Sequence, residues 1–502
     1  MSTMFKILVA FAIGIVLSNL ALFVLSKSQR QSLFTWISTS PRGRRASTAK
    51  TPPRSLSPET KVPSNGPAPV AYNDIFPPSS REALAKAAAT LPPAQRGKLK
   101  GLEVSQVEFK KNIIPWAANY QECGPSTYTP MEISIEEVKA LGDFPDYAEL
   151  SGVPLPEEYE EFDMEKAKSR PYRPFRWAYH QTMSLTRLET NWWLEVESDY
   201  RTRIAQRQNL YAEHGKHVLD YLPGSELACK ELMEMALQFL CARYPRYFSL
   251  SHDSSTGHVF HNRILTTDTV INSVHPLHVL LNNIPEDFAV MLRNPDDGYY
   301  YFRAGVLCSS IGWNVHTKLG LQLKEIHAPI PDYKEKMEFS MDRYFSKLPP
   351  SRPIQRGSWG LEVDKPLFMP PGDPREAHRA TQSPTLPLSR VHLRVDWQTL
   401  RRLPLSGAIV FNFKALFTPV TEFRDEAYIP ALVAKILKKG KEGLMRYKGT
   451  WHVEHVVLPA MEEWKEEQVR RGVVVEGWEE STLEESPWFP GWEEKWHRQQ
   501  GF

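Results

Sequence analysis

The sequence is poor in cysteine, and none of its cysteines is spaced for metal binding. Only Cys123, Cys229, Cys241 and Cys308 occur among its 502 residues, and no two of them form a C-x-x-C pair. This scatter argues against a disulfide framework, a zinc ribbon or an iron–sulfur cluster. Reduced thiols in a cytosolic body are the simplest interpretation.

The signatures of several common enzyme classes are also missing. The chain contains no G-x-G-x-x-G, no P-loop G-x-x-x-x-G-K-[ST], no G-x-S-x-G and no H-E-x-x-H. Their absence weakens, without excluding, dinucleotide binding, phosphoryl transfer, hydrolysis and zincin chemistry. The net charge is only +2 and no long basic run occurs, so nucleic-acid binding is not expected. The 41% hydrophobic and 24% charged residues are ordinary for a globular body.

A strongly apolar run covers residues 7–25, close to the N-terminus. It is just long enough to span a bilayer, and no small-residue cleavage site stands out after Leu25. We therefore expect an uncleaved anchor rather than a secretory signal. Most of the nearby basic residues follow the run, which predicts a single-pass membrane protein with its body on the cytosolic side.

Composition divides the rest of the chain. We expect residues 1–37 to hold the anchor and its flank, and residues 38–99, rich in Pro, Ser, Arg and Ala, to be a disordered linker. Residues 100–447 should form the folded domain. Residues 448–502 form an acidic tail with five tryptophans from Trp464 to Trp496, which we expect to pack back on the body.

The folded region mixes helical and strand patterns. Residues 391–397 alternate strictly, with Val391, Leu393 and Val395 apolar, as in a sheet with one buried face. Strands are predicted at 299–309, 355–363, 390–400 and 407–417, and helices at 134–141, 192–211, 226–244, 286–293 and 426–447. This gives an α+β body with a mostly antiparallel sheet and flanking helices.

The stretch from Gly298 to Pro331 holds the main candidate for chemistry. It ends in Ile326-His327-Ala328-Pro329-Ile330-Pro331. The prolines restrict the residues before them to extended geometry and stop any helix, so His327 leaves a stiff segment. An imidazole held beside an apolar cavity would suit a metal or cofactor. The alternative is a histidine hydrogen-bonded within a core turn.

The histidines offer further candidates. Four H-x-x-H pairs occur: His214/His217, His258/His261, His275/His278 and His452/His455. On a helix this spacing presents two imidazoles on one face, but a zinc site needs a third protein ligand. With 15 histidines in the chain, chance pairs are expected.

Several stretches together resemble the DUF3445 family, which includes a bacterial haem-dependent oxidative N-demethylase and the fungal HRQ family proteins. The matching stretches are PFRWAYHQTMSLTRL (174–188), WLEVESDYRTRIAQR (193–207), PEDFAVM (285–291), GVLCSSIGWNVHTKLGLQLKEIHAPIP (305–331), RGSWGLEVDKPLF (356–368) and LRVDWQTLRRLPLSGAIVFNFKALFTPV (393–420). They span most of the predicted domain. The run ending in Ile-His-Ala-Pro-Ile-Pro and the segment Gln398 to Pro404 are the most specific.

The resemblance implies a PAS-like sheet that holds haem b and removes a methyl group from a small amine, using O₂ and releasing formaldehyde. His327 would be the axial ligand, with His316 ranked second. Arg394, Gln398, Trp313 and Lys318 would be cofactor-binding, with Arg394 suited to pair a haem propionate. Electrons from NADPH would arrive through a separate reductase, because the chain has no nucleotide fingerprint or cysteine cluster of its own.

One departure from the family pattern leaves the activity open. If the fungal His-Arg-Gln triplet belongs just before Thr399, this chain has Asp396-Trp397-Gln398 there, although His497-Arg498-Gln499 occurs in the tail. The change would alter either the cavity or only the packing of a sheet face. A non-catalytic haem- or PAS-type sensor tethered to a membrane is therefore the alternative function, and a tethered interaction protein that uses the tryptophan-rich tail is a third.

Overall fold

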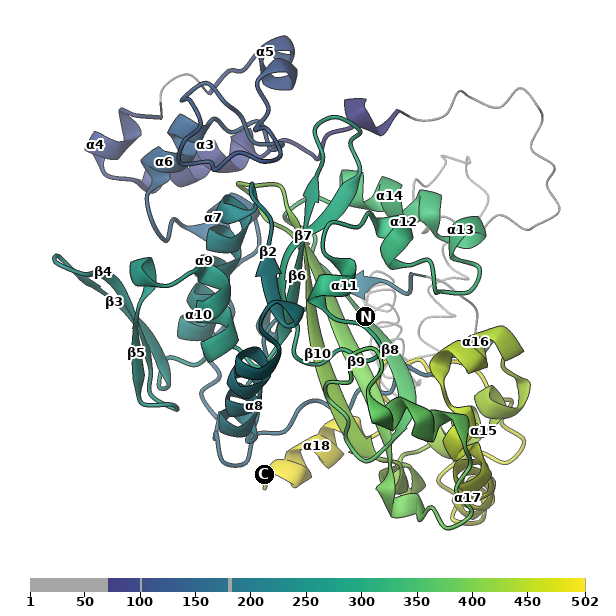
Figure 1. Ribbon diagram of the computed structural model, residues 1–502. Coiled ribbons are helices and arrows are strands. Elements are labelled where there is room, and N and C mark those ends of the chain that lie inside the picture. The colour runs from purple at the N-terminus through teal and green to yellow at the C-terminus, as the bar shows by residue number, and fades with distance from the viewer. Residues whose placement is uncertain (1–70, 100–101, 179–182, 502) are drawn as a thin grey trace, which may run out of the picture. The chain divides into compact units, whose positions relative to one another are not determined.

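The computed structural model describes residues 71–99, 102–178 and 183–501, which are built around one seven-stranded sheet (Figure 1). In order across the sheet, the strands are β1 (Thr186–Arg187), β8 (Ile354–Val363), β9 (Val391–Arg402), β10 (Ile409–Pro419), β6 (Asp287–Arg293), β7 (Tyr300–Val306) and β2 (Leu219–Tyr221). Every neighbouring pair within it is antiparallel. The α+β class with an antiparallel sheet is thus confirmed.

The two faces of the sheet follow from the alternation in β9. Leu393, Val395 and Trp397 are buried in a hydrophobic cluster on one face. Arg394 and Asp396 therefore point to the other face, because successive side chains of a strand alternate. β10 pairs with β9 on one side and with β6 on the other, so these faces continue across the sheet.

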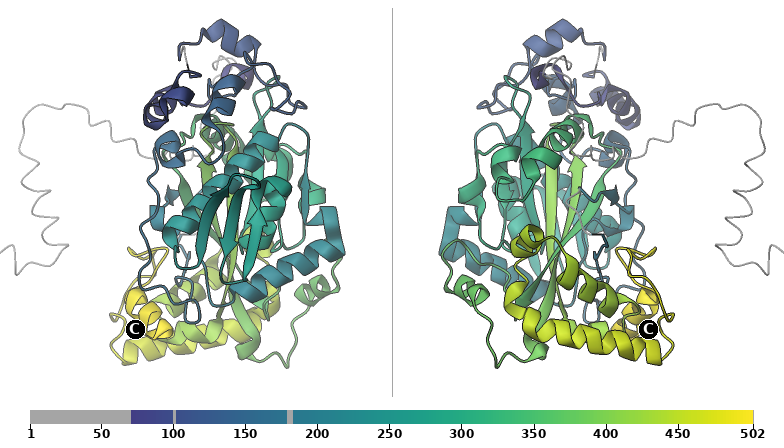
Figure 2. Two further views of the ribbon diagram at one scale, coloured as in Figure 1. Left: turned by 90° about the vertical axis from the view of Figure 1, so that its left-hand side faces the viewer. Right: turned by 90° about the vertical axis from the view of Figure 1, so that its right-hand side faces the viewer.

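The first face is covered by helices at both of its ends. α8 (Tyr200–His214), α9 (Glu226–Arg243) and α10 (Pro276–Asn283) pack against β6, β7 and β10 in the largest hydrophobic cluster. Figure 2 shows these helices in front of the sheet when that side is viewed. α15 (Ile429–Lys439) and α17 (Trp451–Arg470) pack against the β8–β9 end.

The second face carries short helices from the middle of the chain. They are α11 (Val315–Lys318), α12 (Leu323–Ile326), α13 (Tyr333–Lys336) and α14 (Glu338–Lys347). A third hydrophobic cluster joins α14 to β6, β7, β9 and β10. Figure 1 shows this group on the opposite side of the sheet from α8, α9 and α10.

The C-terminal tail packs on the body, as expected. Trp464 on α17 and Trp496 on α18 (Trp492–Gln500) are buried, and Trp496 donates a hydrogen bond to the carbonyl oxygen of Lys168. The helix predicted over 426–447 is instead two helices, α15 and α16 (Glu442–Lys448), because Gly440 ends the first of them.

The helix predicted at 286–293 is wrong, since residues 287–293 form the central strand β6. All seven of its residues are buried between β10 and β7. A strand buried on both faces shows a continuous apolar run rather than alternation, and such a run cannot be told from a buried helix by periodicity alone. Pro285 and Glu286 at its start resembled a helix N-terminus.

Residues 71–99 fall within the stretch predicted as a disordered linker, and they include the helices α3 (Arg81–Thr90) and α4 (Pro93–Arg96); residues 38–70 lie outside the described residues. α3 buries Leu84 and Ala87 in the largest hydrophobic cluster. Small alanine side chains allow this helix to pack closely although its composition is only weakly apolar. The other N-terminal helices are α5 (Gln106–Lys111), α6 (Ile135–Leu141, with a capping box formed by Ser134 and Glu137) and α7 (Tyr147–Ser151).

No helix among the described residues is long and apolar enough to cross a membrane. The anchor predicted at residues 7–25 lies outside the described residues and stays a prediction.

A second, three-stranded sheet was not predicted. It consists of β3 (Phe248–Asp253), β4 (Gly257–Asn262) and β5 (Thr267–Val270), in that order. The described residues also form short 3-10 helices: η1 (Tyr72–Asp74), η2 (Thr190–Trp192), η3 (Gly215–His217), η4 (Ile271–Ser273), η5 (Pro374–Ala380), η6 (Leu388–Arg390) and η7 (Val420–Asp425).

Candidate functional site

A cavity of about 490 Å³ lies on the second face of the sheet. Its walls come from β6 to β10, from α11, α12 and α14, and from the end of α16. This volume is within the range of small-molecule and cofactor sites, about 300–1,000 Å³. All five residues proposed from the sequence as cofactor-binding line it: Trp313, Lys318, His327, Arg394 and Gln398. His316 does not, and its exposed ring instead lies 5.1 Å from that of His217.

His327 is held in one orientation by its own backbone. It follows α12, and its Nδ1 lies 2.7 Å from the carbonyl oxygen of Leu323. A carbonyl only accepts, so Nδ1 carries the proton and Nε2 keeps its lone pair. The ring stacks on Tyr333 with centroids 5.1 Å apart. Burial lowers the pKa of His327 to about 4, so the imidazole is neutral near pH 7.

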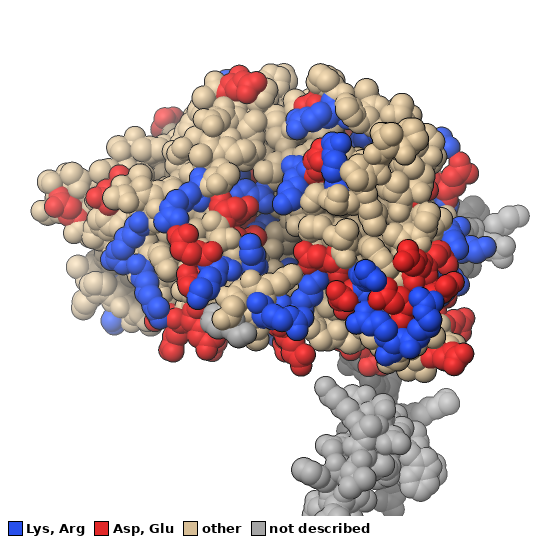
Figure 3. Space-filling model, turned by 90° about the horizontal axis from the view of Figure 1, so that it is seen from below, with Lys and Arg blue, Asp and Glu red and all other residues tan. Residues whose placement is uncertain are grey.

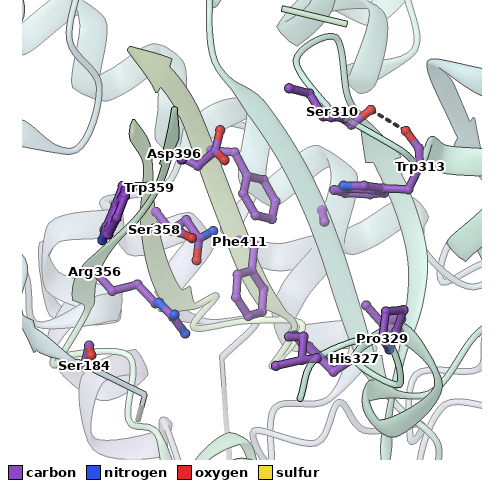
Figure 4. Close-up of a pocket in the computed structure, with 18 of the residues that line it drawn as sticks. Ser184, Ser310, Trp313, His327, Pro329, Arg356, Ser358, Trp359, Asp396 and Phe411 are labelled. Atoms are coloured by element: carbon purple, nitrogen blue, oxygen red, sulfur yellow. Dashed lines mark hydrogen bonds between the residues drawn. The ribbon is translucent and has the colours of Figure 1, made fainter. Parts of the chain in front are cut away.

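Lys318 holds the segment around this histidine, and Trp313 lines the cavity nearby in sequence. The Lys318 ammonium group donates a hydrogen bond of 2.9 Å to the carbonyl oxygen of Ile326, the residue before His327. The carbonyl oxygen of Trp313 accepts a hydrogen bond of 2.6 Å from Ser310 (Figure 4). The ring of Trp313 meets that of Phe413 edge to face. Lys318 thus acts on the position of the histidine.

Most of the cavity wall on the side of His327 is apolar, with Lys318 as a charged member. The apolar part of this wall consists of large aliphatic, aromatic and thioether side chains: Met291, Phe302, Leu323, Ile326, Ile330, Met337, Met341, Phe345, Leu400, Phe411 and Phe413. Most of these belong to the third hydrophobic cluster or pack against it. Such a wall favours the binding of a planar apolar ligand, because it removes the apolar surface of the ligand from water.

The opposite end of the cavity is polar. Two cross-strand pairs of β8 and β9, Arg356 with Gln398 and Ser358 with Asp396, present their side chains to it. Figure 4 shows Arg356, Ser358 and Asp396 on one side of Phe411, with His327 beyond it on the other. The cavity therefore has an imidazole at an apolar end and charged groups at a polar end.

The guanidinium group of Arg394 is largely occupied by the protein itself. It contacts Asp396 at 2.8 Å and donates to the carbonyl oxygens of Ser309, Pro366 and Leu367. Arg394 lines the cavity as expected, but its hydrogen bonds connect β9 to the loop at Ser309 and to the loop at Pro366 and Leu367. Gln398 differs, because its amide faces the cavity with no side-chain hydrogen bond to any described residue.

The three residues of the possible departure from the family pattern, Asp396 to Gln398, lie on both faces of the sheet. Asp396 and Gln398 line the cavity, whereas Trp397 is buried on the other face. Trp397 stacks on Tyr172 with ring centroids 3.8 Å apart. The tryptophan thus affects packing, and the aspartate affects the cavity.

Sequence reasoning missed Lys448. It lies at the end of α16, far from the motifs in sequence, yet it lines the polar end of the cavity. Burial and the neighbouring cation of Arg356 lower the pKa of Lys448 to about 7. No local signal could have identified it, because its place depends on how α16 docks against β8.

The H-x-x-H pairs do not build metal sites. In the described parts of the chain, no three histidine, cysteine, aspartate or glutamate side chains are grouped to hold a metal ion. His261, for example, pairs with Asp268 at 2.7 Å and with Ser251 on the exposed small sheet. A single imidazole suits a metal already held by a macrocycle.

Charges of both signs are mixed on the face of the molecule that Figure 3 shows. On the face seen in Figure 3, lysine and arginine side chains alternate with aspartate and glutamate around a hollow. A nucleic-acid site would instead show a continuous basic patch.

Comparison with known families matches these features to one of them. The model of the family described as haem-dependent oxidative N-demethylase, alpha subunit-like, matches residues 184–458. This range includes β1, β6 to β10, α11 to α16 and all five cavity residues proposed from the sequence. The chain belongs to the haem-dependent oxidative N-demethylase, alpha subunit-like family.

Proposed function

We propose that the cavity binds haem b through Nε2 of His327, and that the protein is a monooxygenase that removes a methyl group from a small amine. The observation that carries the proposal is the neutral imidazole at the apolar end of the cavity, with Nδ1 fixed on the Leu323 carbonyl oxygen. Metal-binding histidines typically donate their second N–H in this way, which sets ring orientation and basicity.

The rest of the cavity fits the same cofactor. The apolar wall would receive the porphyrin, and the polar end would receive its carboxylates. We assign that second role to Arg356, whose side chain lines the polar end of the cavity. The guanidinium of Arg394 binds Asp396 and three carbonyl oxygens, so we assign Arg394 to the fold. Gln398 would offer its amide to the cofactor or the substrate.

When bound, haem would supply the activation of O₂ needed to hydroxylate an N-methyl carbon. The product would fall apart to formaldehyde and the demethylated amine. That oxidation consumes two external electrons per O₂, and we propose that they come from NADPH through a separate reductase. The chain's own contribution is to fix the imidazole, to exclude water with the Phe411 and Phe413 side of the cavity, and to orient the amine.

The experiment is an absorption spectrum of the purified protein reconstituted with haem. We expect a Soret band that His327→Ala abolishes and that His316→Ala, the matched variant outside the cavity, retains. Formaldehyde release from small methylated amines, with O₂ and a reductant, tests the reaction. Haem binding without turnover of any such amine would instead support the sensor, and no haem binding at all would end both proposals.

A further inference from the structure

The polar end of the cavity holds a second group of reactive character, the amine of Lys448. Its Nζ donates a hydrogen bond of 3.1 Å to the Ser358 hydroxyl and lies 5.4 Å from the centre of the Trp359 ring. His327 stands at the other end of the same cavity. Lys448 is therefore placed to meet a small molecule that enters or forms there.

Backbone geometry brings this lysine to the cavity. Lys448 is the last residue of α16, and Gly449 ends the helix in the left-handed conformation with φ of 63°. On β8, a Cβ added to Gly360 would lie 3.2 Å from the Lys448 carbonyl oxygen. A glycine at this position lets the end of α16 approach the strand closely.

The charged groups that act on Lys448 come from two strands, β8 and β9. Arg356 on β8 opposes its protonation, Asp396 on β9 favours it, and burial opposes it most strongly. Tyr447, on its own helix, is affected by the same two charges, and burial raises its pKa. A lysine desolvated beside another cation has the environment in which amines become nucleophiles at neutral pH.

We propose that Lys448 captures a small aldehyde in this cavity as an imine. The neutral amine adds to the carbonyl carbon, and its proton passes to the oxygen to give a carbinolamine. Loss of that oxygen as water leaves the imine, so amine plus aldehyde give imine plus one water with no oxidant or reductant. The Ser358 hydroxyl and the Asp396 carboxylate are placed to relay the proton. The identity of the aldehyde as formaldehyde rests on the proposed function; the reactivity of the lysine does not.

To test this, the full chain is treated, without added haem, with limiting formaldehyde and with cyanoborohydride. Cyanoborohydride reduces an imine formed with formaldehyde to a stable N-methyl group. Modified lysines are then located by peptide mass spectrometry. At pH 7 roughly half of Lys448 would be neutral, against roughly one in a thousand of an ordinary lysine. An amine of lower pKa is also a weaker nucleophile, which offsets part of this difference. We therefore expect Lys448 to react on the order of a hundredfold faster than exposed Lys439. Its rate should show a midpoint near pH 7.

Matched variants make the outcome decisive. Lys448→Arg should remove the fast modification and leave the slow surface reaction unchanged. Asp396→Asn should move the pH midpoint downward, because it removes the charge that favours protonation. Equal rates at Lys448 and Lys439 would overturn the proposal. So would a rate at Lys318, the other cavity lysine, that matches Lys448, because the cavity would then merely concentrate aldehyde.

A second arm repeats the reaction after haem is added. Continued fast modification of Lys448 supports the proposal for the loaded protein. Complete protection would overturn it there, because the cofactor would then occupy the amine. If the protein binds no haem, the first arm still decides the reactivity of the lysine, so failure of the proposed function and failure of this inference are told apart.

Discussion

The ammonium group of Lys318 and the carbonyl oxygen of Ile326 are joined by a hydrogen bond of 2.9 Å, which fastens α11 to the residue before His327. Lys318 lines the cavity, and burial lowers its pKa. Its ammonium group thus holds the turn that precedes His327. This contact connects the two halves of the motif that the sequence analysis identified.

Replacing this lysine should loosen the proposed ligand. We expect Lys318→Met to weaken haem binding by roughly tenfold, the lower end of what is typical for residues that orient a metal ligand. Haem titration followed at the Soret band measures it. Lys324→Met, on the exposed surface of α12, is the control and should bind haem like the unmodified protein. Equal affinity of the two variants would show that the turn is held by other contacts.

Variants of Arg394 test whether this cavity residue binds the cofactor or stabilises the fold. Its contacts to Asp396 and to three carbonyl oxygens predict that Arg394→Met lowers the free energy of unfolding by on the order of 3 kcal/mol. Haem affinity of the folded protein should change little. Denaturant unfolding followed by tryptophan fluorescence, beside a haem titration, separates the two. A large loss of haem affinity at unchanged stability would restore the propionate role expected from the sequence.

The strands whose two faces differ could be predicted from the sequence. In β9 the apolar residues Leu393 and Val395 meet a helix-covered core while Arg394 meets the cavity, so the alternation is visible in the residues. β6 could not be predicted, because both of its faces are buried and its pattern carries no period. The strands β3 to β5 are short and mostly only partly buried, so they carry little apolar signal.

The candidate site was predicted where chemistry and local stiffness coincide. His327 stands out because prolines follow it, and the structure places it on the cavity wall. Lys448 carries no such mark, since its proximity to Ser358 arises only when α16 docks on β8. Residues brought in by tertiary docking have no signature in one sequence.

Stability measurements at Trp397 test whether the His-Arg-Gln triplet of the family would fit at residues 396–398. It is 3% exposed and stacks on Tyr172, on the face away from the cavity. Trp397→Ala should cost about 3–5 kcal/mol of unfolding free energy, as is usual for a buried aromatic side chain. Trp397→Arg should be at least as costly, since it would bury an unpaired cation. If Trp397→Arg is as stable as the unmodified protein, this face tolerates the family triplet and the packing argument fails.

Arg293 ties the N-terminal segment to the sheet. It donates hydrogen bonds to the carbonyl oxygens of Tyr72, Asn73 and Ile75 over 2.7–3.1 Å. Arg293→Ala should therefore expose the chain near these residues to proteases at concentrations that leave the unmodified protein intact. N-terminal sequencing of the fragments locates the cut. Arg246→Ala, at an exposed site, serves as the control, and an unchanged cleavage pattern in Arg293→Ala would mean that the segment is held elsewhere.

Two buried carboxyl groups set the expected pH dependence of stability. Glu231 and Glu286 are both buried, and desolvation raises the pKa of each to about 7 from 4.5. Below pH 4.5 both are protonated in the folded and unfolded chain and contribute no difference. As pH rises towards 7 the unfolded chain loses these protons while the folded protein keeps them, so stability falls.

Each group contributes at most roughly 3 kcal/mol to this fall, which is complete just above pH 7. We therefore expect the denaturant midpoint to be lower at pH 7.5 than at pH 5.5. Glu231→Gln should reduce that difference even if it lowers stability at both values, because its carboxylate accepts hydrogen bonds from the backbone of Leu405 and Ser406. A midpoint that rises with pH, or a difference that Glu231→Gln leaves untouched, would mean that the backbone donors outweigh desolvation at this carboxyl group.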